Sequence, residues 1–97
     1  MPIGAISKSK FRRVLRSLGF VEDESRDHVY LEYYYRGKKI AETKVSHGGD
    51  HDISKRLLSY ILRDQIHLTK QEFENAINGE LSAEDYLIIL KKKGLTD

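Results

Sequence analysis

A hairpin signal in the middle of the sequence constrains the fold more than any other feature. Residues 28–35 and 38–45 are rich in β-branched and aromatic side chains. The pair Arg36-Gly37 between them suits a tight turn, because glycine adopts a positive φ without steric cost. A further short strand is expected at residues 20–23. The centre of the chain therefore predicts three antiparallel strands.

Alternation along the central strand assigns its side chains to two faces of the sheet. The more apolar set, which we expect to face the core, consists of Val29, Leu31, Tyr33 and Tyr35. The set on the other face consists of His28, Tyr30, Glu32 and Tyr34. His28 is therefore expected on the open side of the sheet, although a bulge or a slip of one residue would exchange the two faces.

An amphipathic helix is expected before the sheet, over residues 7–18. Ser7 is a suitable N-cap, and Gly19 stands where a helix commonly ends in glycine. The apolar stripe follows the spacing i, i+3, i+4, i+7 and consists of Phe11, Val14, Leu15 and Leu18. The basic residues lie off that stripe, on or near the solvent side, and are Lys8, Arg12, Arg13 and Arg16.

Three further helices are expected after the sheet. The first spans residues 51–64, and its apolar face consists of Ile53, Leu57, Leu58, Ile61 and Leu62. Two capping-box spacings open the others: Thr69 with Glu72 before residues 70–77, and Ser82 with Asp85 before residues 83–93. The last helix carries too much apolar surface to stand alone in water, so we expect it to dock on the second and third helices.

The order of elements is helix, three strands and helix, followed by two short helices. Because 97 residues support only one small core, we expect a single domain over residues 1–97. Its predicted class is α+β, a two-layer α-β-β-β-α domain with a three-stranded antiparallel sheet. Hydrophobic residues make up 39% and charged residues 33% of the chain, which excludes a disordered tail.

Several protein classes are excluded by what the sequence lacks. It contains no cysteine, which rules out disulfides, thiolate zinc sites and cysteine nucleophiles. No apolar run approaches the roughly 20 residues of a membrane-spanning helix. The stretch from Met1 to Lys10 lacks the apolar centre of a secretory signal. We therefore expect a cytoplasmic protein without a membrane partner.

Charge is distributed unevenly although the net charge is only +2. Residues 1–20 contain five lysines and arginines and no acid, whereas residues 22–27 contain four acids and the single Arg26. A basic patch of this size can bind a polyanion. Charge alone favours the simpler interpretation, which is a solvated surface.

His28 is the strongest candidate for acid–base chemistry. An imidazole with a pKa of about 6.5 gains and loses protons at cellular pH. In RNA cleavage it can take the proton from a 2′-hydroxyl or give one to the departing 5′-oxygen. The competing interpretation is a half-buried polar residue at the start of a strand.

Four side chains after the sheet have the residue types of a metal site: His47, Asp50, His51 and Asp52. Their His-x3-His spacing straddles Gly48-Gly49 instead of a helical turn, so the two rings need not converge. The aspartates are better explained as N-cap and first-turn acids of the next helix. We therefore expect no metal or other cofactor, while His47 can help to hold RNA if it points the same way as His28.

Aromatic and basic side chains share or border the expected open face of the sheet, namely Tyr30, Tyr34, Arg36 and Lys39. Such interleaving suits stacked bases and phosphates. Cross-strand packing explains the tyrosines equally well.

Three stretches resemble the HicA family of small messenger-RNA-cleaving toxins. They are the helix ending in Leu18-Gly19-Phe20 with His28 in the strand that follows, then Val45-Ser46-His47-Gly48, and then Leu57-Leu58-Ser59-Tyr60-Ile61-Leu62 with His67-Leu68-Thr69-Lys70-Gln71-Glu72-Phe73. The resemblance covers residues 7–77, and residues 78–97 form an extension beyond it.

The resemblance implies a double-stranded-RNA-binding-like (dsRBD-like) fold, metal-independent RNA cleavage and a HicB-like antitoxin as partner. His28 falls on the family's catalytic histidine, and His47 matches the place of its second histidine. Arg26-Asp27 stands where the family has Gly-Ser, and Val45 stands where it has proline. Because neighbouring strand residues point to opposite faces, Asp27 need not contact His28.

Three functions remain open at this point. The first is a HicA-like ribonuclease, which needs His28 exposed beside basic residues. The second is a non-catalytic RNA-binding module, which needs only a basic face, and the third is a protein-interaction domain with structural histidines. The candidate RNA-binding residues are Lys8, Arg12, Arg13, Arg16, Tyr30, Lys39 and His47.

Overall fold

The computed structural model describes residues 4–49 and 51–97 and has a mixed α+β architecture. The elements in chain order are β1 (Ile6–Ser7), α1 (Lys8–Ser17), β2 (Val21–Asp23), β3 (Val29–Tyr35), β4 (Lys38–Val45), β5 (Asp52–Ile53), α2 (Lys55–Tyr60), the π-helical segment η1 (Ile61–Gln65), α3 (Lys70–Ile77) and α4 (Ala83–Lys92). No helix in this part of the chain is long and apolar enough to cross a bilayer.

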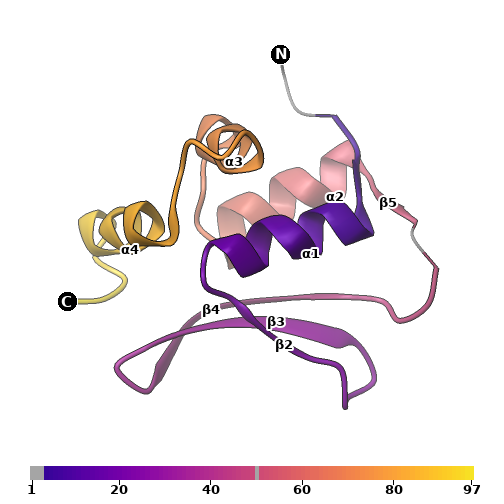
Figure 1. The fold of residues 1–97 in the computed structure, drawn as a ribbon, viewed down its shortest axis with the longest axis horizontal. Helices are drawn as coiled ribbons and strands as arrows, with labels where there is room; N and C mark the ends of the chain where they lie inside the picture. Colours follow the sequence, from indigo (N-terminus) through magenta and orange to yellow (C-terminus); the bar gives the residue numbers. More distant parts are fainter. Residues whose placement is uncertain (1–3, 50) are drawn as a thin grey trace.

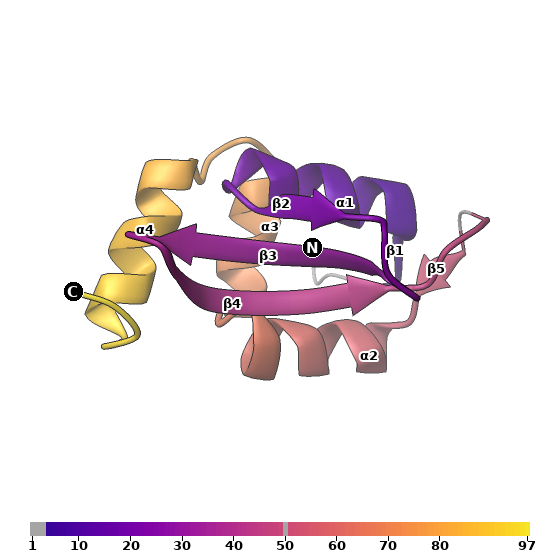
Figure 2. The same cartoon turned by 90° about the horizontal axis from the view of Figure 1, so that it is seen from below.

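The three-stranded sheet is antiparallel with the order β2-β3-β4, as the sequence predicts. Helices α1 and α2 lie over one of its faces, whereas the other face is open (Figure 1; Figure 2). Helix α4 lies at the end of the sheet where β3 ends and β4 begins (Figure 2). The core is therefore a sheet covered by helices on one side only.

The face assignment along β3 is confirmed for the residues that matter most to the core. Val29, Leu31 and Tyr33 are all buried, and Tyr34 is exposed. A register shift between Tyr33 and Tyr34 follows, so the alternation changes near the turn. The turn itself uses two left-handed residues, Arg36 at φ 53° and Gly37 at φ 77°, which matches the twist of the flanking strands.

Helix α1 is confirmed with its cap and its buried stripe. The backbone N–H of Lys10 donates to Ser7 Oγ at 3.2 Å, and the stripe residues pack into the core. The chain leaves the helix through Gly19 at φ +105°, where a Cβ would lie 3.2 Å from the Tyr33 ring. A left-handed turn with an aromatic ring against it favours glycine here.

The expected start of the second helix at residue 51 is wrong. Asp52 and Ile53 instead form β5, which pairs with β1, so Asp52 is not a first-turn acid. Ser54 caps α2 by accepting from the backbone N–H of Leu57 at 3.2 Å. The pairing with β1 is a tertiary contact that no local pattern near residue 51 encodes. Asp50, the proposed N-cap, lies outside the described residues.

Both capping boxes at α3 and α4 are confirmed. Helix α4 buries Tyr86 and Leu90, leaves Leu87 half-buried and exposes Ile88. The Tyr86 ring packs against Phe20 and Tyr33, with centroid distances of 5.5 and 5.0 Å. The aromatic contacts of α4 are thus with the sheet layer, whereas its polar contacts reach Ile66, which follows η1, and Glu72 of α3.

Candidate functional site

His28 immediately precedes β3 and its side chain is 38% exposed. Its Nδ1 atom is buried and lies 3.2 Å from Asp27 Oδ2, at an angle that does not form a hydrogen bond. The polar contact and charge of this imidazole lower the pKa of the Asp27 carboxyl, which is therefore ionised at neutral pH. Asp27 and His28 do contact each other, because both precede β3, within which side chains alternate between the two faces of the sheet.

A cavity of about 300 Å³ lies beside His28, between the end of β4, β5 and α2. Its floor is apolar and its polar lining includes two histidines and two lysines. The lining residues are Lys8, His28, Lys44, Val45, Ser46, His51, Asp52, Ile53, Leu57 and Ile61. A concave surface with an apolar floor and few polar groups is typical of a ligand site.

Lys8 is placed at this cavity but is not a solvent-exposed cation. Its side chain is buried, and Nζ donates to Ser46 O at 2.9 Å, Ser46 Oγ at 3.2 Å and Gly48 O at 2.5 Å. All three ammonium protons have acceptors in this loop, so Lys8 holds the loop in place.

The second histidine of the cavity is His51, and not His47. The Nε2 atom of His47 lies 2.8 Å from the carbonyl oxygen of Arg26, and the ring does not line the cavity. The His51 ring lies against the left-handed Gly49, where a Cβ would be 2.8 Å from it. The sequence singled out His51 only as a metal candidate.

Tyr30 lies on the open face of the sheet, among cations that the sequence did not assign to the site. The Arg26 guanidinium lies 3.5 Å from the Tyr30 ring centroid, and Lys44 Nζ lies 5.9 Å from it. The Tyr30 hydroxyl donates to Asp27 Oδ1 at 3.4 Å. A hollow of about 260 Å³ is lined by Arg26, Tyr30 and Lys44 together with Glu42, Thr43 and Gln65.

The arginines of α1 do not line the His28 cavity, and two of the three are paired with acids. Arg12 donates to Glu22 at 2.6 Å and to Glu24 at 3.0 Å, and Arg16 donates to the same Glu22. Arg13 is exposed on another side of the helix. Glu22 in β2 and Glu24 after it thus pair with Arg12 and Arg16, which the sequence predicted to bind RNA.

Lys39 is also remote from His28. It pairs with Tyr34 in the β3–β4 register, whereas Val29, next to His28, pairs with Val45 at the other end of the hairpin. Its Nζ lies 2.8 Å from Glu42 and 3.5 Å from Glu32. Of the predicted RNA-binding residues, Lys8 lines the His28 cavity, and Tyr30 and His47 lie near His28 through their contacts with Asp27 and Arg26.

No group of three or more histidine or acidic side chains within residues 4–49 and 51–97 is arranged to hold a metal ion. The chain matches no protein-family model, and it has no significant similarity to curated proteins or to solved structures.

Proposed function

We propose that this protein is a HicA-like, metal-independent endoribonuclease with a dsRBD-like arrangement. The observation that supports it best is the cavity beside His28, which joins a half-exposed imidazole to Lys44 and a second imidazole, His51. Two titratable rings and a cation around one concave surface are what RNA transesterification requires. A cytoplasmic location fits this proposal, because the messenger RNA substrate is found there.

In the proposed reaction, one imidazole takes the proton of a ribose 2′-hydroxyl, and the 2′-oxygen attacks the adjacent phosphorus. The bond to the 5′-oxygen breaks, and that oxygen gains a proton from the second imidazole. The products are a 2′,3′-cyclic phosphate and a 5′-hydroxyl. Lys44 is placed to stabilise the additional negative charge on the phosphoryl oxygens.

Asp27 has a positioning role in this scheme. Its ionised carboxylate lies next to Nδ1 of His28 and favours the tautomer that carries a proton there. Nε2 is then left to act as the base, and Asp27 acts through its charge because the contact with Nδ1 has no hydrogen-bond geometry.

The first prediction concerns His28. His28→Ala should abolish cleavage of a messenger RNA transcript and leave the fold and melting temperature close to wild type. His51→Ala should lower cleavage by about 10²-fold or more, in the range typical of a lost general acid. His47→Ala is the matched control and should retain activity, because His47 bonds to Arg26 O and does not line the cavity.

EDTA should leave the wild-type rate unchanged in the same assay, because the proposed reaction uses no metal. Full cleavage by a folded His28→Ala variant would refute the assignment. Loss of wild-type activity on chelation would refute the metal-independent mechanism.

The HicB-like partner is proposed on the same basis. A protein that covers the His28 cavity would exclude RNA, and the exposed Leu57 on its rim offers apolar contact area. The non-catalytic RNA-binding alternative is less well supported, because it relies on the basic face of α1, where Glu22 pairs with Arg12 and Arg16.

A further inference from the structure

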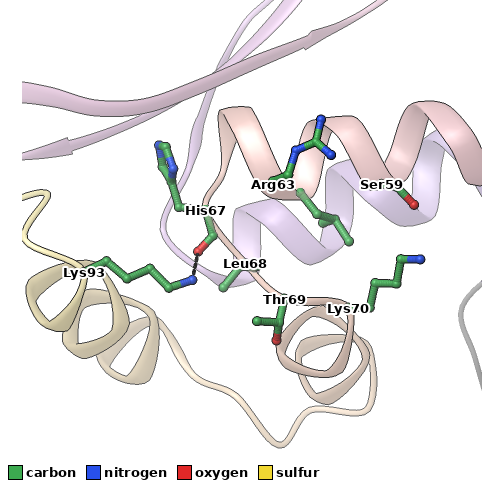
Figure 3. Close-up of a pocket in the computed structure, with 8 residues that line it drawn as sticks. Ser59, Arg63, His67, Leu68, Thr69, Lys70 and Lys93 are labelled. Carbon is green, nitrogen blue, oxygen red and sulfur yellow. Dashed lines mark hydrogen bonds between the residues drawn. The ribbon is translucent and has the colours of Figure 1, made fainter.

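A second concave surface lies among the helices, away from the His28 cavity. It has a volume of about 420 Å³ and lies between the α2–η1 segment, the start of α3 and the end of α4 (Figure 3). Four basic side chains line it: Arg63, His67, Lys70 and Lys93. The rest of the described lining is Ser59, Leu62, Leu68 and Thr69, so it contains no carboxylate.

This cavity continues into a neighbouring groove along α2, because Ser59 and Arg63 line both. The groove adds Lys55, Arg56 and Tyr60 to the surface, and the Tyr60 side chain is among the most exposed large hydrophobic groups, at 47%. Together the two hollows place five cations, one histidine and one exposed aromatic ring on a continuous surface. Basic side chains that follow a groove with an aromatic ring are the usual platform for single-stranded nucleic acid.

The charges on this surface are only partly neutralised. No ion pair joins Lys55, Arg56 or Lys70 to another residue in the described ranges. Arg63 donates to its neighbour Asp64 at 2.9 Å. Lys93 donates to the carbonyl oxygen of His67 at 2.6 Å and lies 3.4 Å from Glu72 (Figure 3).

His67 reports on the electrostatics of the cavity. Its backbone is left-handed at φ 62°, which directs its carbonyl oxygen to Lys93. Burial and the Lys93 charge lower the pKa of its imidazole, whereas Asp64 has the smaller opposite effect. An anion bound in the cavity would therefore raise this pKa, which makes His67 a spectroscopic probe of occupancy.

We propose that these two hollows form a track for single-stranded RNA, with phosphates at Arg63, Lys70 and Lys93 and a base stacked on Tyr60. The inference rests on the proposed ribonuclease function and extends it by naming where the strand binds beyond the cleavage site. It also gives the extension a role, because α4 ends at Lys92 and delivers Lys93 to the track. Arg12 and Arg16 of α1, which both pair with Glu22, are not part of it.

The test is the salt-dependent binding of a fluorescent single-stranded RNA with 2′-O-methyl riboses, which cannot be cleaved. Each phosphate contact to a single strand contributes about 0.7 to the slope of log affinity against log salt. Lys70→Gln with Lys93→Gln should weaken binding about tenfold at 0.1 M salt and flatten the slope by about 1.4. Lys38→Gln, an exposed lysine at the turn end of β4, is the matched control and should change neither.

Lys70→Gln alone keeps the test valid if the double variant is unstable, because no side-chain hydrogen bond or ion pair within residues 4–49 and 51–97 ties Lys70 to α4. That single variant should flatten the slope by about 0.7. Unchanged affinity and slope in folded variants would overturn the track. The track would also be overturned if polyglutamate displaced the fluorescent RNA more strongly than unlabelled RNA does, in a salt-dependent way. The partner would then be an acidic protein.

A second measurement separates this inference from the ribonuclease proposal. In NMR titrations with inorganic phosphate, the His67 pKa should rise in the wild type and not in Lys70→Gln. If phosphate raises this pKa and the variants weaken RNA binding while the wild type cleaves no RNA, the track stands and the ribonuclease proposal fails. If His28-dependent cleavage is found but RNA affinity and the His67 pKa are unaffected, the track fails and the ribonuclease proposal stands.

Discussion

Lys8 occupies the polar flank of an amphipathic helix, yet its ammonium is buried against the loop between β4 and β5. It donates to two carbonyl oxygens and one hydroxyl, in Ser46 and Gly48. Hydrogen bonds that involve a charged group stabilise a fold by about 1.5–3 kcal/mol. Lys8→Met should therefore lower the free energy of unfolding by about 2 kcal/mol, measured by urea denaturation.

The same variant should increase amide hydrogen exchange in residues 46–49, because the loop loses its tie. Lys10→Met is the matched control on the same helix, since Lys10 is exposed, and it should change stability by less than about 0.5 kcal/mol. Equal effects of the two substitutions would show that the Lys8 hydrogen bonds contribute nothing to stability.

Residue roles could be predicted from the sequence only where they depend on near neighbours. Ser7 was correctly identified as a cap because its partner, Lys10, is three residues away. The pairing of Arg12 with Glu22 requires β2 to fold back along α1, so helix periodicity predicted solvent exposure for a side chain that is tied to an acid. Similarly, no spacing rule separates His47 from His51; the conformation of the loop determines which ring lines the cavity.

Helix α4 is anchored by Tyr86, whose ring is fully buried. Its hydroxyl donates to the carbonyl oxygen of Ile66 at 2.8 Å. Tyr86→Phe keeps the ring and removes this buried bond, so it should destabilise the protein by about 1 kcal/mol. Tyr34→Phe, at an exposed position on β3, is the matched control and should be close to neutral.

Alkaline pH provides a second test of the same anchor. Burial raises the pKa of Tyr86 above its usual value of about 10, so the neutral form is favoured in the folded state. The resulting stability is fully present below pH 10, and it is lost as the unfolded state begins to ionise above that pH. The difference in unfolding free energy between wild type and Tyr86→Phe should therefore shrink above pH 10. A constant difference up to pH 11 would mean that Tyr86 ionises as easily folded as unfolded.

The elements that could be predicted from sequence are those with local boundary signals. The capping boxes at Thr69 and Ser82 and the Arg36-Gly37 turn are each contained within four residues, and all three are confirmed. The start of α2 was predicted four residues early because β5 exists only through its pairing with β1, far away in the chain. The docking of α4 on the sheet layer depends on Phe20 and Tyr33, which no pattern within α4 identifies.

The open face of the sheet and the helical side of the molecule differ in charge, which the net charge of +2 does not reveal. The open face of the sheet contains Glu32 and Glu42 directly opposite each other, with Lys39 between them and Arg26 near Glu32. Lys55, Arg56 and Lys70, which have no ion pair within the described residues, lie instead along α2 and the start of α3. An RNA strand is therefore expected to approach from the helical side and to avoid the centre of the sheet.

The acidic centre of the sheet leads to a prediction about acid stability. The hydrogen bond from Lys39 lowers the pKa of the Glu42 carboxyl, against the smaller effect of burial. Because the folded pKa lies below the unfolded one, the stabilisation is present above a pH of about 4.5 and is lost as pH falls through the folded pKa. Glu42→Gln should therefore lower the unfolding free energy at pH 7 by less than about 1 kcal/mol, as for other ion pairs near the surface.

That deficit should shrink as pH falls through the folded pKa of Glu42, and vanish once Glu42 is protonated in both states and the variant and the wild type carry the same charge. Thermal melts of both proteins between pH 2.5 and 7 measure it, and Glu80→Gln, in the exposed link between α3 and α4, is the control. In 1 M salt the deficit should shrink at every pH, because the pair is partly exposed to solvent. A Glu42→Gln variant more stable than the wild type at pH 7 would show the reverse balance, in which repulsion between Glu32 and Glu42 exceeds the attraction of Lys39.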